Sequence, residues 1–507
     1  MQGDARMKEK RETVGRKRAA LAVVDATIKE GTPAELEALA RALVSVVPDG
    51  VALETDLANM HRMVARHCTN LRFVPAWGKW IYFDGKRWTT DEGAHMQAAK
   101  ATTQRIKAEA NELLAAGSTD SKKRFAWAVS SQQARQLNAM VQLARTDPRV
   151  VVDHESFDRD PWLLNVQNGT IDLRTGMPRP HHREDLINRI CPVAFDPHAT
   201  CPIWDAFVLQ IMGGDAALVG YLQRMIGYAL TGNIREHILG FFFGSGSNGK
   251  TTFLSTIGFI LGDYAVHAAR GLLFQKRGES HPTELTDLFG RRFVTCAEIE
   301  EGLNFDEALV KDITGGEPIR ARRMREDFWQ FRPTHKLFIA GNHKPTVRGT
   351  DDGIWRRLRL VPFTVTIAPE ERDKDLPRKL LDEAPGILAW AVRGCLEWQH
   401  VGLGDPPTVI QATKTYREES DLLGAFFDTR LRFDPNERLL KSELTKHLKA
   451  WADELGLRLM PPRQVAARLK AKGATDGTMR TQVPGQVRDA WLGVALLERE
   501  SLAACRA

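Results

Sequence analysis

The fold is decided by one stretch, ILGFFFGSGSNGKT, which occupies residues 238–251. Its first six residues are apolar and are typical of a buried strand. They run directly into the pattern G-x-x-x-x-G-K-T, and an apolar helical pattern follows that stops at Gly262. A strand, a glycine-rich loop and a helix in this order are the context that a phosphate-binding loop (P-loop) requires. The residues predicted to bind the phosphates are Gly244, Ser245, Gly246, Ser247, Asn248, Gly249, Lys250 and Thr251.

The residue types in this loop suit a nucleoside triphosphate. Glycine lets successive backbone N–H groups point at an anion, because no Cβ stands in the way. The positive end of the following helix faces the same anion. Lys250 is expected to bridge the β- and γ-phosphates, and the hydroxyl of Thr251 is expected to ligate Mg²⁺. ATP and Mg²⁺ are therefore the predicted cofactors.

Hydrolysis of ATP also needs an acid, and the stretch FVTCAEIEE at residues 293–301 supplies a short apolar strand that ends in carboxylates. One carboxylate would hold the metal or its water shell while another accepts the proton of the attacking water. Glu298 is the first choice for the metal and Glu300 for the base, with the role of Glu301 left open. The alternative is that these are solvated charges at a strand end.

Two further strand ends complete a candidate catalytic set. KLFIAGN, residues 336–342, ends in Asn342, whose neutral amide can hold the water or touch the γ-phosphate without adding charge. GIWRRLRLVPF, residues 353–363, places Arg356 and Arg357 before another strand. An arginine that reaches a γ-phosphate across a subunit boundary would stabilise the charge of the transition state. Each feature alone has a structural explanation, but the four in this order favour catalysis.

Positive charge gathers just beyond the acidic strand. The chain has 71 Lys+Arg and 64 Asp+Glu, a net charge of +7, and residues 318–360 alone carry a net charge of +7. Residues 319–332 are typical of a hairpin with its tip near 324–328, which would present cations to a phosphate backbone and an aromatic ring to a base. The alternative is an edge hairpin with solvated charges and core aromatics. The candidate DNA-binding residues are Arg322, Arg323, Arg325 and Phe328.

The rest of the chain is divided by its patterns. The predicted class is α/β, with a parallel sheet over about 238–363. The expected parts are a mostly helical region (1–150) with a β-hairpin near 73–88, an N-proximal collar or oligomerisation domain (151–232), the ATPase (233–400), a Gly/Pro linker (401–420) and a winged-helix-like domain (421–507). The aromatic residues of the first hairpin either stack on bases or, as the favoured alternative, pack against their neighbours. A winged helix serves equally often for DNA binding and for protein docking.

Composition excludes several classes of protein. Within the 507 residues no apolar run approaches the ~18–20 residues that span a bilayer, and the first twenty residues lack the apolar stretch of a signal peptide. We therefore expect a soluble intracellular protein with no membrane partner. The six cysteines are scattered without a CxxC pair, so neither a zinc site nor a disulfide framework is expected.

The series GSGSNGKT, FVTCAEIEEG, KDITGGEPIRARR, KLFIAGNHKP and WRRLRLVPF resembles the superfamily 3 helicases. Within them it is similar to the phage/plasmid primase–helicase group, which is related to poxvirus and satellite-phage proteins. The resemblance covers about 155 to 500. It implies an AAA+ core in a hexameric ring that moves 3′ to 5′ along single-stranded DNA. It also implies replication of a phage or plasmid in the cytoplasm of a bacterial host.

Carried over by position, the resemblance makes Lys250 and Thr251 the phosphate and Mg²⁺ residues and places Glu298 and Glu300 at the acidic strand end. It makes Asn342 the sensor, and it makes Arg356 or Arg357 the arginine supplied in trans. The expected partners are single-stranded and forked DNA, further copies of the chain in a homo-hexamer, and replication proteins such as a primase and a polymerase.

The sequence departs from its relatives in one respect. Many of them carry a primase module, whose polymerase site needs clustered carboxylates for two metals. The only D-x-D pairs here, Asp158/Asp160 and Asp373/Asp375, lie in polar or Pro-flanked contexts. We therefore expect an ATP-dependent DNA helicase without primase activity. The alternative function is an origin-binding replication initiator or scaffold that uses ATP as an assembly switch and binds duplex DNA through residues 421–507.

Overall fold

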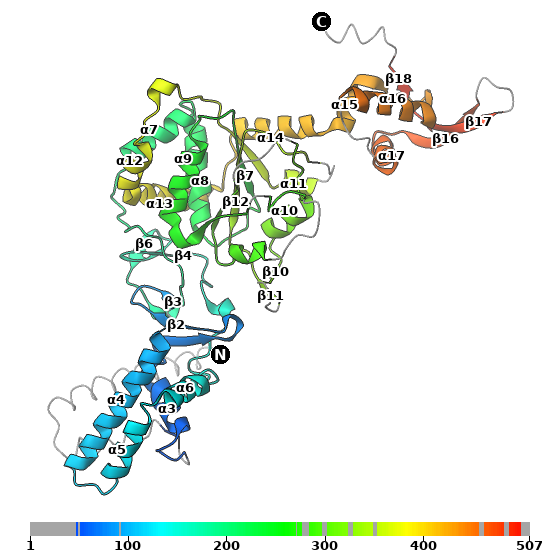
Figure 1. The fold of residues 1–507 in the computed structure, drawn as a ribbon. Helices are drawn as coiled ribbons and strands as arrows, with labels where there is room; N and C mark the ends of the chain where they lie inside the picture. Colours follow the sequence, from blue (N-terminus) through cyan, green and yellow to red (C-terminus); the bar gives the residue numbers. More distant parts are fainter. Residues whose placement is uncertain are drawn as a thin grey trace, which may run out of the picture. The chain divides into compact units, whose positions relative to one another are not determined.

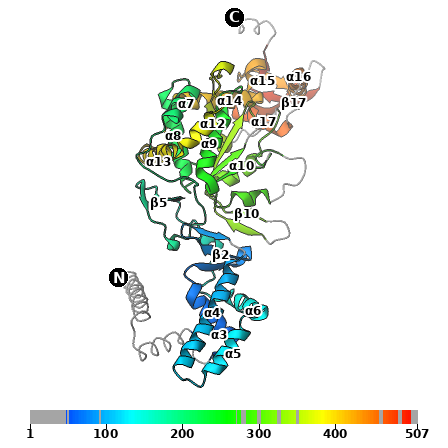
Figure 2. The same cartoon turned by 60° about the vertical axis from the view of Figure 1, so that its left-hand side comes forward.

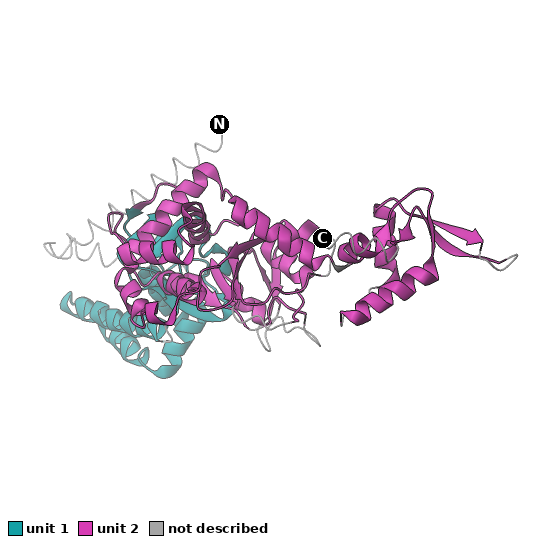
Figure 3. Ribbon diagram, turned by 90° about the horizontal axis from the view of Figure 1, so that it is seen from above, with its two compact units in different colours: residues 1–171, 178–190 teal, residues 172–177, 191–507 magenta. Residues whose placement is uncertain are grey.

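The computed structural model describes residues 47–48, 51–90, 93–269, 271–275, 283–296, 302–322, 328–347, 352–455, 461–480 and 486–497. The chain divides into two compact units (Figure 3). Unit 1 comprises residues 1–171 and 178–190, and unit 2 comprises residues 172–177 and 191–507. Each unit is described by itself.

Unit 1 combines a helical group with a small antiparallel sheet. Its helices are α3 (Asp56–His67), α4 (Ala94–Ala115), α5 (Ser121–Ser130) and α6 (Ala134–Ala144), and its sheet has the order β1 (Leu71–Val74), β2 (Lys79–Phe83), β3 (Trp88–Thr90). The predicted hairpin is present, and its turn is closed by the N–H of Asp84, which donates to the carbonyl of Arg87 at 3.0 Å. Trp80 and Trp88 are buried, so these aromatics pack the core.

A second three-stranded sheet, β4 (Leu163–Val166), β5 (Gly169–Asp172) and β6 (Met177–Arg179), lies where the chain passes from unit 1 to unit 2 and back. Its strands are joined by turns at residues 167–168 and 173–176, where the pairs Asn168-Gly169 and Thr175-Gly176 favour turns. Gly169 permits a close approach, because a Cβ there would lie 2.5 Å from the carbonyl oxygen of Arg179.

The centre of unit 2 is a five-stranded sheet whose paired strands are all parallel. Its order is β13 (Leu358–Pro362), β7 (Leu239–Phe243), β12 (Lys336–Gly341), β9 (Phe293–Cys296) and β8 (Ala265–His267). Because the strands are parallel, their carboxyl ends share one edge of the sheet. The parallel α/β class predicted from the sequence is therefore confirmed.

Helices cover both faces of this sheet. Side chains alternate along β7, so that neighbouring residues of this strand contact helices on opposite faces. Leu239 and Phe241 belong to a core formed with α10 (Glu307–Thr314), α11 (Asp352–Trp355) and α14 (Pro407–Ser420). On the other face the ring of Phe242 lies 5.8 Å from that of Phe253 in α9 (Lys250–Leu261), and Gly240 faces Met225 of α8 (Ala216–Leu230). Figure 1 shows these two layers on opposite sides of β7 and β12.

The face covered by α9 is thickened by three more helices, α7 (Pro202–Ile211), α12 (Leu376–Asp382) and α13 (Ala384–Val401), which gather with α8 and α9 in Figure 2. The backbones of α8 and α13 approach closely: a Cβ at Gly394 would lie 2.1 Å from the carbonyl oxygen of Gln223. The segment predicted as a linker contains α14, which packs against β13. The Pro406-Pro407 pair stands at the beginning of this helix, a position that proline suits because its missing N–H has no partner there.

The C-terminal part of unit 2 has a hydrophobic core of its own, which includes Phe426, Phe427, Leu469 and Trp491. Its elements are α15 (Leu422–Arg430), β14 (Leu431–Arg432), β15 (Arg438–Leu440), α16 (Lys441–Glu454), α17 (Pro462–Ala471), β16 (Thr475–Arg480), β17 (Val487–Leu492) and β18 (Ala495–Leu496). Strands pair in the orders β15-β17-β16 and β14-β18.

Within the described ranges, no single helix is long and apolar enough to cross a bilayer; α7 and α8 pass that test only as a pair bent by 117°. The five cysteines in the described part of the chain, Cys68, Cys191, Cys201, Cys296 and Cys395, are all free thiols.

Candidate functional site

The predicted phosphate loop lies at the carboxyl edge of the parallel sheet. Strand β7 ends at Phe243, which is in register with Gly341 at the end of β12, and the N–H of Gly244 donates to the carbonyl of Gly341 at 3.3 Å. Asn342 follows β12 directly. The loop and the predicted sensor residue are therefore brought together because two adjacent parallel strands end side by side.

The loop takes a conformation that ordinary residues avoid. Gly246 has φ +106°, Ser247 has φ +50° and Gly249, which caps α9, has φ +81°. A Cβ at Gly249 would lie 2.5 Å from Cγ2 of Ile211 and 3.1 Å from the ring of Phe207, both on α7. The second glycine of the motif is thus needed for its backbone angle and for the packing of α7 beneath the loop.

The ammonium group of Lys250 is buried and turned onto the loop. Its Nζ donates to the carbonyl of Gly244 at 2.7 Å, to Oδ1 of Asn248 at 2.9 Å and to Oδ1 of Asn342 at 3.2 Å. The side chain is 5% exposed, and burial lowers the pKa of Lys250 to about 8. Three oxygens therefore hold a cation in the first turn of the helix that follows the loop, where an incoming phosphate would compete for it.

Several neighbours are open to solvent and suit an anion. Ser245, Ser247 and Thr251 are exposed, and the hydroxyl-bearing Thr251 lies in the first turn of α9. The positive end of a twelve-residue helix faces this position. The arrangement can bind a polyphosphate with backbone N–H groups, a lysine and a helix dipole acting on the same charge.

Two supports of the loop were missed by reasoning from the sequence. The segment after β13 runs beside the loop: Nδ2 of Asn248 donates to the carbonyl of Phe363 at 3.2 Å, and the N–H of Ile367 donates to the carbonyl of Ser247 at 2.8 Å. The other support is the packing of α7 against Gly249. Both depend on contacts across more than a hundred residues or between separate helices, and no local pattern signals them.

The acidic part of the predicted site is only partly described. Strand β9 ends at Cys296, which is in register with Ile339 of β12, so β9 points to the same edge as Asn342. Glu298, Glu300 and Glu301 lie outside the described residues. No group of three or more His, Cys, Asp or Glu side chains suited to a metal ion occurs within the described ranges.

Arg356 and Arg357 lie at the opposite edge of the sheet. The carbonyl of Arg357 accepts a hydrogen bond from the N–H of Leu239 at 2.8 Å, which places both arginines beside the beginning of β7. Gly244 follows the end of that strand, about 16 Å further along at ~3.3 Å per residue. This separation exceeds the reach of an arginine side chain, so neither arginine lies at the phosphate loop of its own chain. Arg356 is exposed and Arg357 is half-buried.

The predicted basic hairpin is present. Strands β10 (Ile319–Ala321) and β11 (Trp329–Phe331) pair antiparallel, with Ala321 opposite Trp329. The chain between them includes Arg323 and Arg325, which lie outside the described residues. Ile319, Ala321 and Phe331 are buried, whereas Arg320, Arg322 and Phe328 are exposed.

The two described arginines of this hairpin share one aromatic ring. The guanidinium carbon of Arg320 lies 4.2 Å from the ring centroid of Phe328, and that of Arg322 lies 4.6 Å from it. Trp329 instead packs against Phe289 at a centroid distance of 5.0 Å. Cation–π contacts of this kind hold two positive charges together at the exposed face of the hairpin.

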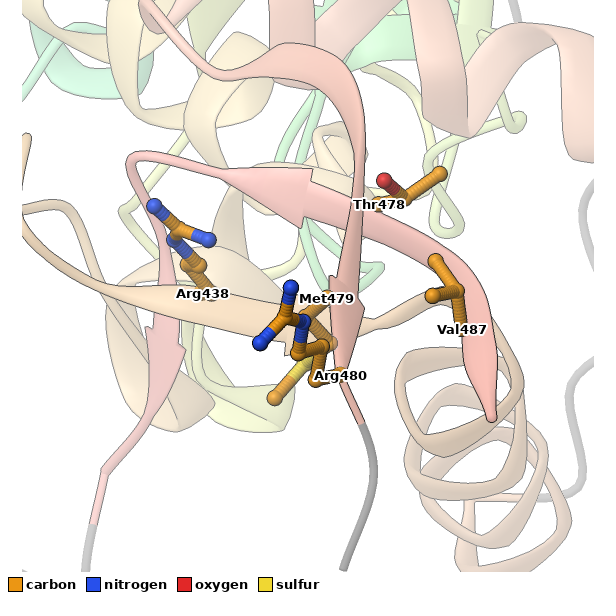
Figure 4. A pocket seen from close by; sticks show the side chains of 5 residues that line it. All are labelled: Arg438, Thr478, Met479, Arg480 and Val487. Carbon is orange, nitrogen blue, oxygen red and sulfur yellow. The ribbon is translucent and has the colours of Figure 1, made fainter. Parts of the chain in front are cut away.

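A second basic feature lies on the C-terminal sheet. Arg438, Thr478, Met479, Arg480 and Val487 line a shallow hollow over β15, β16 and β17 (Figure 4). Both arginines are exposed, and 55% of the Val487 side chain is accessible to solvent. A hollow with two guanidinium groups and a hydroxyl suits a phosphate group better than an apolar ligand.

Comparison with known families gives two matches. Residues 60–213 match the family described as D5 N terminal like. Residues 242–357, which hold the phosphate loop, the basic hairpin and both arginines, match a family of unknown function, DUF5906.

Viral proteins are similar over a longer stretch. The chain is 26% identical over 321 residues to L207/L206 of Acanthamoeba polyphaga mimivirus, which is named as a candidate helicase; the match covers 58% of this chain and 33% of the relative. It is 26% identical over 267 residues to the candidate helicase 022R of Frog virus 3, covering 48% of this chain and 27% of the relative. It is 26% identical over 347 residues to the candidate primase C962R of African swine fever virus, covering 62% and 35%. The chain thus spans about a third of the length of these curated relatives.

Among solved structures, the A-form apo structure of the NrS-1 C-terminal region superposes with a TM-score of 0.48 at 10% sequence identity. The superposition covers 83% of this chain and 95% of that chain.

Proposed function

Because the chain belongs to the phage and viral primase–helicase family, we propose that it is an ATP-dependent DNA helicase of superfamily 3 with an AAA+ core. It would act in the replication of a phage or plasmid, in the cytoplasm of the bacterial host, together with a primase and a polymerase. The main observation behind the proposal is the hydrogen bond from Nζ of Lys250 to Oδ1 of Asn342 at the phosphate loop.

The residues of this edge have separate tasks in ATP hydrolysis. The backbone N–H groups of residues 244–251 and the ammonium of Lys250 bind the β- and γ-phosphates, and the amide of Asn342 orients the attacking water. Glu300 would accept the proton of that water. Thr251 and Glu298 are the residues that would hold Mg²⁺, whose contribution when bound is to neutralise charge on the phosphates.

The position of the arginines supports a site shared between subunits. Since Arg356 and Arg357 lie at the amino edge of their own sheet, an arginine from this pair can act on a γ-phosphate only if that phosphate is bound by another copy of the chain. A ring of like subunits meets this requirement at every interface, and a homo-hexamer is the ring we propose. The resulting charge stabilisation is worth about 10³–10⁵-fold in turnover in other phosphoryl-transfer enzymes.

The hairpin supplies the contact with DNA. Arg320 and Arg322 would bind the phosphates of a single strand, and Phe328 would hold the two guanidinium groups in place. Arg323 and Arg325, which lie outside the described residues, are proposed as further contacts with the DNA. In the sequence the hairpin lies between the acidic strand β9 and the sensor strand β12. We propose that hydrolysis at the ends of these strands moves the hairpin.

Strand displacement tests this function. Forked DNA with either a 3′ or a 5′ single-stranded tail is incubated with the purified chain and ATP, and the release of a labelled strand is followed. We expect release from the 3′-tailed substrate, none without ATP, and none with Lys250→Ala. Release only from the 5′-tailed substrate would contradict the direction, and no release from either would contradict the helicase function.

We propose further that the chain synthesises no primers. Both D-x-D pairs take part in local contacts: Oδ1 of Asp160 accepts from the N–H of Trp162 at 3.0 Å, and Oδ2 of Asp373 accepts from Nζ of Lys379 at 2.6 Å. Neither pair lies on a strand of a sheet. Incubation with single-stranded template and labelled nucleotides should give no oligonucleotide product, whereas a ladder of short products would overturn this proposal.

The second candidate function is an origin-binding initiator or scaffold, and the exposed Arg438 and Arg480 on the C-terminal sheet favour it. It predicts sequence-specific binding of duplex DNA that Arg438→Ala/Arg480→Ala abolishes, together with no unwinding at any ATP concentration. Unwinding of forked DNA by the wild-type chain separates the two functions in favour of the helicase.

A further inference from the structure

The adjacent arginines Arg356 and Arg357 differ in what they contact. Nε of Arg357 donates to Oγ1 of Thr314 at 3.0 Å, and its Nη1 donates to the carbonyl of Gly353 at 2.8 Å. Its carbonyl accepts from the N–H of Leu239 at the beginning of β7. The side chain and backbone of Arg357 thus join α10, α11 and β7.

Thr314 connects Arg357 to the segment that leads into the basic hairpin. It is 5% exposed, and its hydroxyl donates to the carbonyl of Val310 while accepting from Arg357. The carbonyl oxygen of Thr314 lies 2.9 Å from Nδ1 of His237. His237 precedes β7, which begins at Leu239. Thr314 is also the last residue of α10, and only residues 315–318 separate it from β10 of the basic hairpin. Arg357 therefore anchors the end of the helix that leads into the hairpin.

Arg356 has the opposite character. Its side chain is exposed, and the part of the chain that the structure describes offers its guanidinium no hydrogen-bond partner. Its N–H donates to the carbonyl of Asp352, which continues the turn of α11. An exposed guanidinium with no hydrogen-bond partner among the described residues, next to one that is held by two hydrogen bonds, is the arrangement expected if Arg356 reaches outward while Arg357 holds the backbone in place.

We propose that Arg356 is the arginine that acts on the neighbouring subunit's γ-phosphate, and that Arg357 is a positioning residue which, through Thr314, couples Arg356 to the root of the hairpin 319–331. This inference rests on the proposed function. The coupling runs both ways: DNA bound at the hairpin changes the placement of Arg356, and hydrolysis sensed by Arg356 moves the hairpin.

The contact is tested by comparing ATP turnover with and without single-stranded DNA. Thr314→Val removes the hydroxyl at nearly constant volume, and Thr314→Ser is the matched control that keeps it. We expect Thr314→Val to retain DNA-free turnover and to lose stimulation by DNA, and Thr314→Ser to keep both. Arg357→Ala should lose stimulation too, and Arg357→Ala/Thr314→Val should lose no more than either single variant, since the two residues act through one contact. Thermal unfolding checks that each variant is folded.

The two arginines are then separated by mixing subunits. Arg356→Ala should lose turnover by about 10³-fold or more. Mixed with Lys250→Ala, it should regain part of it, because the intact phosphate loop of an Arg356→Ala subunit can then meet the intact arginine of a Lys250→Ala neighbour. Recovery of the Arg357→Ala variant in the same mixture would make Arg357 the arginine in trans and overturn the assignment. DNA stimulation that survives in Thr314→Val would overturn the coupling. A wild-type chain without ATP turnover would instead contradict the proposed function itself.

Discussion

The ammonium of Lys250 and the side-chain carbonyl of Asn342 lie 3.2 Å apart, and this hydrogen bond joins the first turn of α9 to the residue after β12. The two residues are 92 positions apart in the chain, and the parallel pairing of β7 with β12 brings them together. A phosphate entering the loop would take the lysine from its oxygen partners. Asn342 would then be left beside the terminal phosphate, where it can report whether that phosphate is present.

The lowered pKa of Lys250 predicts how nucleotide affinity depends on pH. With a pKa of about 8 in the free protein, the ammonium is charged at pH 7 and mostly neutral at pH 9. Since phosphate binds the charged form, affinity for ADP should be flat below pH 8 and fall about ten-fold per pH unit above it. Binding measured by fluorescence of a labelled ADP between pH 7 and 9.5 tests this. Lys250→Arg, which stays charged, should show no fall in this range.

The lowered pKa of Lys250 also affects stability, and here the effect increases with pH, whereas nucleotide affinity decreases. Between pH 8 and 10.5 the unfolded chain keeps a proton on Lys250 that the folded chain has released, so this group makes the free energy of unfolding rise with pH in that window. Comparing urea unfolding of the wild-type chain and Lys250→Met at pH 8 and 10 isolates the effect. A wild-type chain that gains no stability relative to Lys250→Met would contradict the buried ammonium.

Asn342→Ala should slow ATP hydrolysis more than it weakens nucleotide binding. The variant removes an amide that is expected to act on the water and the γ-phosphate, and the loss of one such group costs roughly 10²-fold in turnover. The measurement is steady-state hydrolysis beside equilibrium binding of ADP. Asn436→Ala, which alters an exposed amide in the C-terminal part, is the matched control. Wild-type turnover in Asn342→Ala would rule out a catalytic role for the residue.

Two glycines of α9, one at its N-terminal cap and one in its interior, should respond oppositely to alanine. At Gly249 the positive φ and the 2.5 Å approach to Ile211 should cost about 1–3 kcal/mol and weaken nucleotide binding. At Gly258, inside α9, a Cβ meets nothing within 4 Å, so alanine should stabilise the helix by about 0.5–1 kcal/mol. Thermal unfolding of both variants provides the comparison. Equal melting temperatures would show that the loop at Gly249 is not strained.

The hairpin arginines should contribute to DNA affinity as charges. Arg320→Ala/Arg322→Ala should weaken binding of single-stranded DNA and reduce the slope of log K against log salt by about 1.4, at ~0.7 for each phosphate that the variant no longer neutralises. Phe328→Ala should weaken binding less, since it frees the two cations without removing them. Arg378→Ala, at an exposed arginine on α12, is the control. An unchanged salt slope in the double variant would exclude these two arginines from the DNA interface.

How much the sequence predicts depends on whether the relevant residues are contiguous. All eight residues of the phosphate loop are consecutive, so their pattern is visible without the fold. The meeting of Asn342 with Lys250 also follows from the sequence, because parallel strands end at one edge of the sheet. The sequence also predicts which side chains of the hairpin face solvent. Because side chains alternate along a strand, Arg320 and Arg322 are exposed and Ala321 between them is buried.

The remaining features depend on contacts that leave no local signal. Packing of Phe207 and Ile211 against Gly249 joins α7 to the start of α9, two helices that are separate in the sequence. The hydrogen bond from Asn248 to Phe363 spans 115 residues. The sequence presents Arg356 and Arg357 as equivalent neighbours. The fold distinguishes them, since Arg357 is half-buried and bound to the hydroxyl of Thr314 and the carbonyl of Gly353, whereas Arg356 is exposed.

The nucleotide site is tested most directly by the rate of ATP hydrolysis of the wild-type chain and of Lys250→Ala, each with and without single-stranded DNA. We predict hydrolysis by the wild-type chain that DNA accelerates, and a loss of roughly 100-fold or more in the equally folded variant. A wild-type chain that neither binds nor hydrolyses ATP, or a variant that hydrolyses it at the wild-type rate, would contradict the assignment of residues 244–251 to the nucleotide site.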